Sequence, residues 1–223
     1  MNNVIIVAGG SGKRFKSKIP KQFLELSGKA ILMQTIEVFF NYDTSLQIIL
    51  VLPEQHIEYW KNLCKKYNFK INHKIVLGGN TRFHSVKNAL DTIPVSDNLV
   101  AIHDGVRPLV STATIERCFA KAKKTGNAIP AIPPHDSVRL INKNTNRIIN
   151  RSSLLLIQTP QVFRIDKLKQ AYSQDYREIF TDDASVLETF GEKIYLVEGN
   201  RENIKITSNI DLVIAKALIK NKT

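Results

Sequence analysis

The residues with the clearest chemical potential lie near the start of the chain, in a glycine-rich loop that follows a short apolar run. They are Ala8, Gly9, Gly10 and Gly12, followed by Lys13, Arg14 and, after Pro20, Lys21. Glycine lets backbone N–H groups turn inward and lets a bulky anion approach the backbone closely. Because the three basic side chains surround this concavity, the combination predicts a binding site for a nucleoside triphosphate.

Two familiar phosphate-binding motifs do not fit this loop. The Walker pattern requires Ser or Thr after Gly-Lys, and Arg14 stands there instead. The dinucleotide fingerprint requires a third glycine at the position of Phe15. An ordinary glycine-rich turn with solvated basic residues is therefore an open alternative, since such turns are common after the first strand of α/β folds.

A second polar segment follows a buried strand and begins with His103 and Asp104. An aspartate at the carboxyl end of a strand is well placed to hold a metal ion or a sugar hydroxyl. Arg107 is close enough in sequence to pair with Asp104 or to reach a phosphate. The alternative is a turn at the strand end with a local ion pair.

A third segment, Gly78 to Ser85, follows another strand and opens a helix. A helix N-terminus favours anions, and the Gly78-Gly79 pair lets a flat base lie against the backbone. The alternative is a helix start capped by Asn80 or Thr81.

Four polar residues of the second half stand close to predicted element ends: Arg151, Thr159, Thr181 and Lys205. Thr181 is expected to cap a helix whose first turn is acidic. Lys205 lies between two isoleucines of a predicted short strand, so it points away from them. If the isoleucines are core residues, Lys205 faces a cleft or water. Spacing alone assigns none of these residues to a ligand.

The composition is that of a globular protein, with 223 residues, 43% hydrophobic and 23% charged. We expect residues 1–223 to form a single domain with a full core. No apolar run has the length of a membrane span, and no signal peptide is recognised. The two cysteines, Cys64 and Cys118, lie far apart and are expected to stay reduced, as in a cytoplasmic protein.

The net charge of +12 suits nucleic acid, a membrane surface or small polyanions. The basic residues are spread along the chain, and no RNP motif, zinc finger or helix-turn-helix is evident. We therefore expect small anionic substrates, with neither nucleic acid nor a membrane as a partner.

The elements that must position these residues alternate between strands and helices. Strands are predicted at 23–26, 47–52, 74–77, 99–102, 127–132 and 194–197, and helices at 54–67, 112–124, 165–174 and 182–189. This alternation predicts a doubly wound, mostly parallel α/β sheet. Ligands of such sheets bind at the carboxyl ends of the strands, where the glycine loop and Asp104 lie. A closing amphipathic helix is predicted from the spacing of Ile210, Val213, Ile214, Ala217 and Leu218.

Residues 137–141 and 147–150 flank a polar turn at 142–146 and predict a β-hairpin. An isolated hairpin is marginally stable in water, so it must pack on something. We expect residues 135–157 to form an arm that pairs with a second subunit. A hairpin folded onto its own domain is the alternative.

Taken in this order, the motifs resemble the 2-C-methyl-D-erythritol 4-phosphate cytidylyltransferases of the isoprenoid precursor pathway. The matching segments are residues 8–14, 20–22, 78–85, 103–108, 159–161, 181–185 and 198–207. No single segment is diagnostic, but the series is specific. The resemblance implies a Rossmann-like nucleotidyltransferase fold with a protruding β-hairpin arm that clasps a second subunit, giving a homodimer.

The resemblance also implies the reaction and the residues that perform it. CTP and 2-C-methyl-D-erythritol 4-phosphate give 4-CDP-2-C-methyl-D-erythritol and pyrophosphate, with Mg²⁺ bound with CTP through protein ligands that the sequence leaves open. The implied catalytic residues are Arg14 and Lys21. The implied CTP-binding residues are Ala8, Gly9, Gly10, Gly12, Lys13, Gly79 and Ser85. The implied sugar-phosphate-binding residues are Asp104, Arg107, Arg151, Thr159, Thr181 and Lys205, with Arg151 supplied by the partner's arm.

Three departures from the family pattern concern the choice of acceptor. Gly9 stands where this branch often has Ala and also suits the related ribitol 5-phosphate cytidylyltransferases. Phe15 and the pair Gly105-Val106 also differ from common residues. Residues 181–185 look more like the methylerythritol branch, whose acceptor we predict. The alternatives are ribitol 5-phosphate as acceptor, a sugar-1-phosphate nucleotidylyltransferase for another nucleotide, and a non-catalytic polyanion or nucleic-acid binder.

Overall fold

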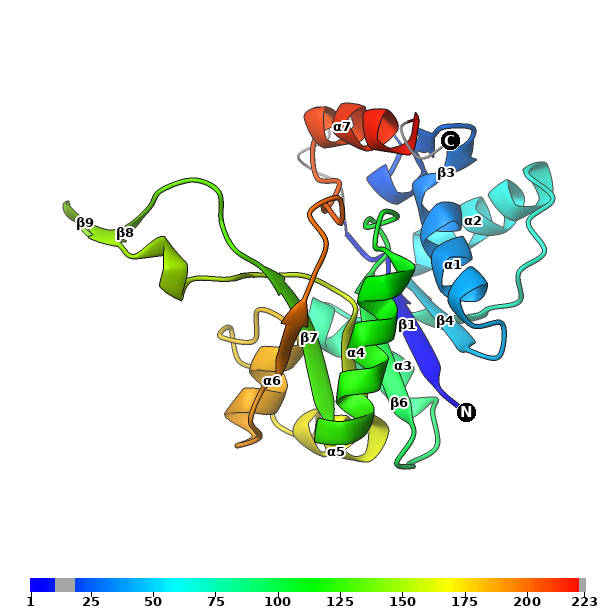
Figure 1. The fold of residues 1–223 in the computed structure, drawn as a ribbon. Coiled ribbons are helices and arrows are strands. Elements are labelled where there is room, and N and C mark those ends of the chain that lie inside the picture. Colours follow the sequence, from blue (N-terminus) through cyan, green and yellow to red (C-terminus); the bar gives the residue numbers. More distant parts are fainter. Residues whose placement is uncertain (11–18, 221–223) are drawn as a thin grey trace.

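A computed structural model describes residues 1–10 and 19–220. Its centre is a sheet with the strand order β10-β7-β11-β6-β1-β4-β5, and β12 lies beside β7 (Figure 1). The strands are β1 (Asn3–Val7), β4 (Gln47–Leu52), β5 (Lys74–Leu77), β6 (Leu99–Asp104), β7 (Asn127–Ile132), β10 (Leu156–Ile157), β11 (Gln161–Arg164) and β12 (Leu196–Glu198).

The predicted doubly wound, mostly parallel sheet is confirmed. β1 pairs in parallel with β4 and β6, and β4 pairs in parallel with β5. Two strands are antiparallel to their neighbours: β11, which lies between β6 and β7, and β10, which pairs with β7. The sequence did not predict β11. The parallel strands therefore end together at one edge of the sheet, as a shared ligand site requires.

Helices cover both faces of the sheet because the strands are apolar on both sides. The helices are α1 (Ile31–Tyr42), α2 (Glu54–Lys66), α3 (Arg82–Asp91), α4 (Thr112–Thr125), α5 (Ile165–Ala171), α6 (Asp183–Thr189) and α7 (Asn209–Lys220). Val4 and Ile6 of β1 join a core with α1, α2 and α4. Ile5 points to the opposite face and joins a core with α3, α5 and α6.

Several predicted boundaries are wrong in detail. Residues 23–26 are not one strand, because a 3₁₀ turn at Lys21–Phe23 precedes the short β2 (Glu25–Leu26), which pairs with β3 (Lys29–Ala30). The helix predicted at 165–174 ends at Ala171. The segment around Lys205 is not a strand, although Ile206 is buried and Lys205 exposed, as the alternation required.

The predicted closing helix forms, but most of the residues that marked it are exposed. Leu218 packs beside the buried Ala215, whereas Ile210, Val213, Ile214 and Ala217 are exposed. The helix carries apolar residues on more than one face, so periodicity alone did not identify the buried one. No helix in the described ranges has the length and apolar character needed to cross a lipid bilayer.

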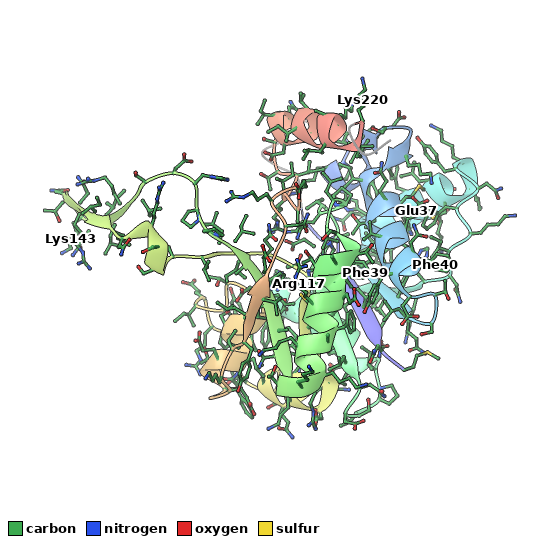
Figure 2. All side chains as sticks on the ribbon, viewed as in Figure 1. Glu37, Phe39, Phe40, Arg117, Lys143 and Lys220 are labelled. Atoms are coloured by element: carbon green, nitrogen blue, oxygen red, sulfur yellow. The ribbon has the colours of Figure 1, made fainter. Side chains whose placement is uncertain are left out.

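The predicted hairpin forms, with a shorter turn than expected. β8 (Val138–Asn142) and β9 (Thr145–Ile149) pair only with each other, and Asn142 lies opposite Thr145. Lys143 in the turn has a φ of 49°. The hairpin projects away from the sheet and its helices, and Figure 2 shows Lys143 at its far tip. It therefore does not fold back onto its own domain.

Candidate functional site

A cleft of about 590 Å³ lies where β1, β4, β5 and β6 end. It brings together eight of the residues singled out from the sequence: Ala8, Gly9, Gly10, Lys21, Gly79, Ser85, Asp104 and Lys205. They come from the ends of β1, β5 and β6, from α3, from the 3₁₀ turn and from the segment before α7. The predicted convergence of the glycine loop and Asp104 at the carboxyl edge of the sheet is thus confirmed.

The remaining predicted residues fall into two groups. Gly12, Lys13 and Arg14 lie outside the described residues. Arg107, Thr159, Arg151 and Thr181 are described, but none of them lines the cleft.

Asp104 is the electrostatic centre of the cleft. Its Oδ2 lies 3.0 Å from Nε of Arg107 and 3.2 Å from Nζ of Lys205. Burial alone would raise the pKa of Asp104, but the charges of Lys205, Arg82 and Arg107 outweigh burial and hold this pKa well below its usual range. The carboxylate therefore stays ionised, and it is a poor general base.

Thr159 lies behind Asp104 and supports it. The Asp104 backbone N–H donates to the Thr159 hydroxyl at 3.1 Å, and that hydroxyl bonds Nδ1 of His103 at 3.1 Å. Nε2 of His103 lies 3.0 Å from the Arg107 carbonyl, which can only accept, so Nε2 carries the proton. Burial lowers the pKa of His103 to about 4. The neutral imidazole of His103 therefore holds the end of β6 through its bonds to Thr159 and to the Arg107 carbonyl.

Arg107 and the fully buried Asn203 hold the segment that carries Lys205. Arg107 donates from Nη1 to the Asn203 carbonyl at 2.7 Å, and the Asn203 amide donates to the Thr159 carbonyl at 2.8 Å. The Ile206 N–H donates to the Val106 carbonyl at 3.0 Å. Lys205 thus projects from a braced backbone, and its side chain is 43% exposed while Nζ contacts Asp104.

The Gly78–Gly79 turn is shaped by the start of α3. The Gly79 N–H donates to Ser85 Oγ at 3.0 Å, and Thr81 caps the helix by accepting from the His84 N–H. A side chain at Gly79 would place its Cβ 2.5 Å from that of His84, so only glycine fits. Glycine at this position therefore lets the turn pack closely against the start of α3.

Lys21 is positioned by its two neighbours. Gln22 is buried and donates from Nε2 to the Ala8 carbonyl at 2.9 Å, which ties the 3₁₀ turn to the end of β1. Phe23 packs between Tyr59 and Trp60 of α2, with ring centroids 5.1 and 6.2 Å away. These anchors fix the backbone from which Lys21 reaches the cleft.

Arg151 and Thr181 occupy different surroundings from those of the cleft. Arg151 is exposed at the base of the arm, where its Nη1 donates to the His135 carbonyl at 2.7 Å. Thr181 is exposed as well, and it is not the helix cap that the sequence suggested. Asp182 caps α6, accepting from the Ser185 N–H at 2.8 Å.

Arg82 lines the cleft but was not among the predicted site residues. It pairs with the buried Asp183, which is 101 residues away in the sequence. Local spacing therefore gives no sign of its role, and only its position in segment 78–85 of the family resemblance could have identified it.

The cleft offers few ligands to a metal ion. Nowhere in residues 1–10 and 19–220 do three His, Cys, Asp or Glu side chains gather in a group that could hold one. Asp104 and Glu54 are the carboxylates that line the cleft. A hard cation such as Mg²⁺ prefers oxygen ligands, so Asp104 fits as a single protein ligand for an ion that arrives with a triphosphate.

Comparisons with known proteins agree with this geometry. The sequence model of a family described as "IspD: 2-C-methyl-D-erythritol 4-phosphate cytidylyltransferase" matches residues 2–221. Curated relatives bear the same enzyme name. One from Phocaeicola vulgatus is 50% identical and covers 97% of this chain and 99% of its own length. One from Azobacteroides pseudotrichonymphae is 53% identical and covers 97% of both chains.

Solved structures show the same fold. The 4-diphosphocytidyl-2C-methyl-D-erythritol synthase of Anaerococcus prevotii superposes with a TM-score of 0.83 at 29% identity, covering 98% of this chain and 96% of its own. The 2-C-methyl-D-erythritol 4-phosphate cytidylyltransferase of Francisella tularensis gives 0.79 at 34% identity, with 97% and 98% covered.

Proposed function

The chain belongs to the 2-C-methyl-D-erythritol 4-phosphate cytidylyltransferase family, a family of nucleotidyltransferases of isoprenoid biosynthesis, and we propose that the cleft described above is its active site. CTP and 2-C-methyl-D-erythritol 4-phosphate are its substrates. One observation carries the proposal, namely that Lys21, Asp104 and Lys205 meet the two glycine turns in a single cleft.

In the proposed reaction, a phosphate oxygen of the acceptor attacks the α-phosphorus of CTP in line. The P–O bond to the β-phosphate breaks, and pyrophosphate leaves with that electron pair. A phosphate monoester has a second pKa of about 6, so it is mostly dianionic at neutral pH and needs no general base. The low pKa of Asp104 and the buried, neutral His103 fit a mechanism without one.

The protein's work is then positioning and charge stabilisation. Lys21, together with Arg14 outside the described residues, stabilises charge on the phosphoryl oxygens. Ala8, Gly9, Gly10, Gly79 and Ser85 line the nucleotide end, which Gly12 and Lys13 complete. Lys205 holds the acceptor phosphate, and Asp104 binds substrate hydroxyls or the metal ion.

Mg²⁺ is the proposed cofactor, and Asp104 would hold it together with the triphosphate. When bound, it neutralises charge on the phosphate oxygens. Arg107 and Lys205 contact Oδ2 of Asp104 and fix the orientation of its carboxylate. Its Oδ1 would then be the oxygen that faces the ion.

We further propose that residues 135–157 clasp a second copy of the chain and that Arg151 reaches the partner's acceptor site. Ile141 and Ile148 of the hairpin are 75% and 74% exposed, and β8 and β9 pair only with each other. Thr159 and Arg107 act on the acceptor through Asp104 and Lys205. Thr181 does not line the cleft, and we propose that it contacts the acceptor in the bound state. The two unpaired cysteines, Cys64 and Cys118, suit a cytoplasmic location.

Pyrophosphate release from CTP tests the proposed function. We expect release with 2-C-methyl-D-erythritol 4-phosphate and Mg²⁺, and much slower release with ribitol 5-phosphate. Faster release with ribitol 5-phosphate would reassign the acceptor, and no release with either acceptor would refute the proposed reaction.

A further inference from the structure

A buried acidic residue behind the cleft has no place in the reaction proposed above. Asp183 has no exposed surface and accepts three hydrogen bonds. Arg82 donates from Nη1 at 2.9 Å and from Nη2 at 2.6 Å, and the Tyr172 hydroxyl donates at 2.6 Å. Burying a carboxylate is unfavourable unless it is paired and hydrogen-bonded, and these three bonds satisfy that condition.

The partner of this carboxylate reaches the cleft. Arg82 opens α3, directly after the Gly78–Gly79 turn, and its side chain is 29% exposed. Burial alone would lower the pKa of Arg82, but the charge of Asp183 raises it, so the guanidinium stays charged. Its two-pronged bond to one carboxylate fixes the plane of the guanidinium as well as its place.

Tyr172 braces the same helix start in a second way. Its ring stacks on Phe83, with centroids 4.7 Å apart and planes 18° from parallel. One side chain thus holds both residues that open α3, Phe83 by stacking and Arg82 through Asp183. These contacts join α3 to Tyr172, which follows α5, and to Asp183, which opens α6.

We propose that Asp183 and Tyr172 are positioning residues for the nucleotide: through Arg82 they hold the start of α3 and the Gly78–Gly79 turn in the geometry that binds CTP. The inference rests on the proposed function and deepens it, because it names residues that act on one substrate and not on the other. A purely structural role would weaken the fold and leave both Michaelis constants unchanged at temperatures where the protein is folded.

Steady-state kinetics of the folded variants separates the two roles. A misplacement of about 1 Å can reduce turnover on the order of 10²-fold, so we expect kcat/KM for CTP to fall by about that factor in Asp183→Asn. The KM for the acceptor should not change. Tyr172→Phe keeps the stacked ring and should show a smaller loss in the same direction.

Asp166→Asn is the matched control. It breaks another bidentate Arg–Asp pair, Arg164–Asp166, which lies on the surface away from the cleft. This variant should retain both Michaelis constants.

A double-mutant cycle tests whether Asp183 acts through Arg82. In an Arg82→Ala background, Asp183→Asn should cause little further loss in kcat/KM for CTP, because coupled residues are not additive. Additive losses would overturn the proposal. So would an unchanged KM for CTP in Tyr172→Phe, which decides the matter even if Asp183→Asn does not fold. If the wild-type protein releases no pyrophosphate, the proposed function itself fails, which is a different outcome.

Discussion

The polar side chains in and behind the cleft differ from those of the arm in their burial and in their hydrogen-bond partners. Asp104 in the cleft is buried, as are Thr159 and Asn203 behind it, and each is bonded to partners from distant parts of the same chain. In the arm, by contrast, Ile141 and Ile148 are exposed, and Arg151 bonds only a carbonyl at the arm's own base.

This difference indicates which parts of the site come from one chain and which come from a second chain. Of the described residues that line the cleft, none comes from 135–157. A two-stranded hairpin with exposed apolar residues is marginal in water unless another surface covers it. We infer that one chain builds the nucleotide end of the site by itself and that a second chain completes the acceptor end.

The largest expected effect is a loss of turnover on substitution of Lys21, which lines the cleft. Lys21→Ala removes a charge that acts mainly in the transition state, so we expect kcat to fall by about 10²–10³, as for the loss of a single stabilising donor. Rapid-quench or steady-state measurement at saturating substrates checks this. Lys29→Ala, which removes a lysine paired with Glu37 on the surface, is the control and should retain full turnover. Normal turnover in Lys21→Ala would remove Lys21 from the mechanism.

A smaller and more selective effect is expected in the arm. A hydrogen bond to a charged group contributes about 1.5–3 kcal/mol, so Arg151→Ala should raise the KM for the acceptor by roughly 10-fold or more. The KM for CTP should change far less, because the nucleotide end lies within one chain. Arg147→Ala on the same arm is the matched control. An equal rise in both Michaelis constants would contradict the proposal that Arg151 acts at the acceptor end and not at the nucleotide end.

The assembly itself provides a third comparison. Ile148→Asp places a charge on the exposed face of the arm, and we expect it to shift the protein from dimer toward monomer in sedimentation experiments. Val95→Asp changes an equally exposed apolar residue away from the arm and should leave the assembly state alone. A wild-type protein that is monomeric at micromolar concentration would contradict the proposed role of the arm.

A fourth comparison concerns the acid stability of His103, which lies behind the cleft. His103 is neutral when folded, with a pKa of about 4, and its unfolded pKa is about 6.5. The unfolded chain therefore binds the proton first, and the free energy of unfolding should decrease as the pH falls from 6.5 to 4, by up to about 3 kcal/mol from this residue. His103→Gln should show a shallower decrease in denaturant titrations, whereas the exposed His135→Gln should match the wild type. Identical slopes in all three proteins would contradict the buried neutral imidazole.

Local patterns predicted the parts of the site that depend on neighbouring residues. β1 with its glycines, Asp104 at the end of β6 and the hairpin all follow from short stretches of sequence. The strand β11 was missed because it is short and antiparallel, with residues such as Phe163 that suit either a strand or a helix.

The bracing of the cleft could not be predicted for a different reason. Arg82 and Asp183 are 101 residues apart, and Asp104 and Thr159 are 55 apart. Which polar residue touches a ligand and which supports a neighbour depends on tertiary packing that no local spacing records. Thr159 is an example, because a threonine hydroxyl can bind a ligand or support a neighbouring residue equally well.

The most direct test mixes two impaired variants. Lys21→Ala and Arg151→Ala subunits are unfolded together, refolded together and assayed for pyrophosphate release at an acceptor concentration well below the wild-type KM. If Arg151 acts on the partner's site, each mixed dimer regains one complete site, so activity should return to about a quarter of the wild-type value. If the mixture is no more active than its two components, Arg151 does not complete a neighbouring site, and the division between a self-contained nucleotide end and a shared acceptor end is wrong.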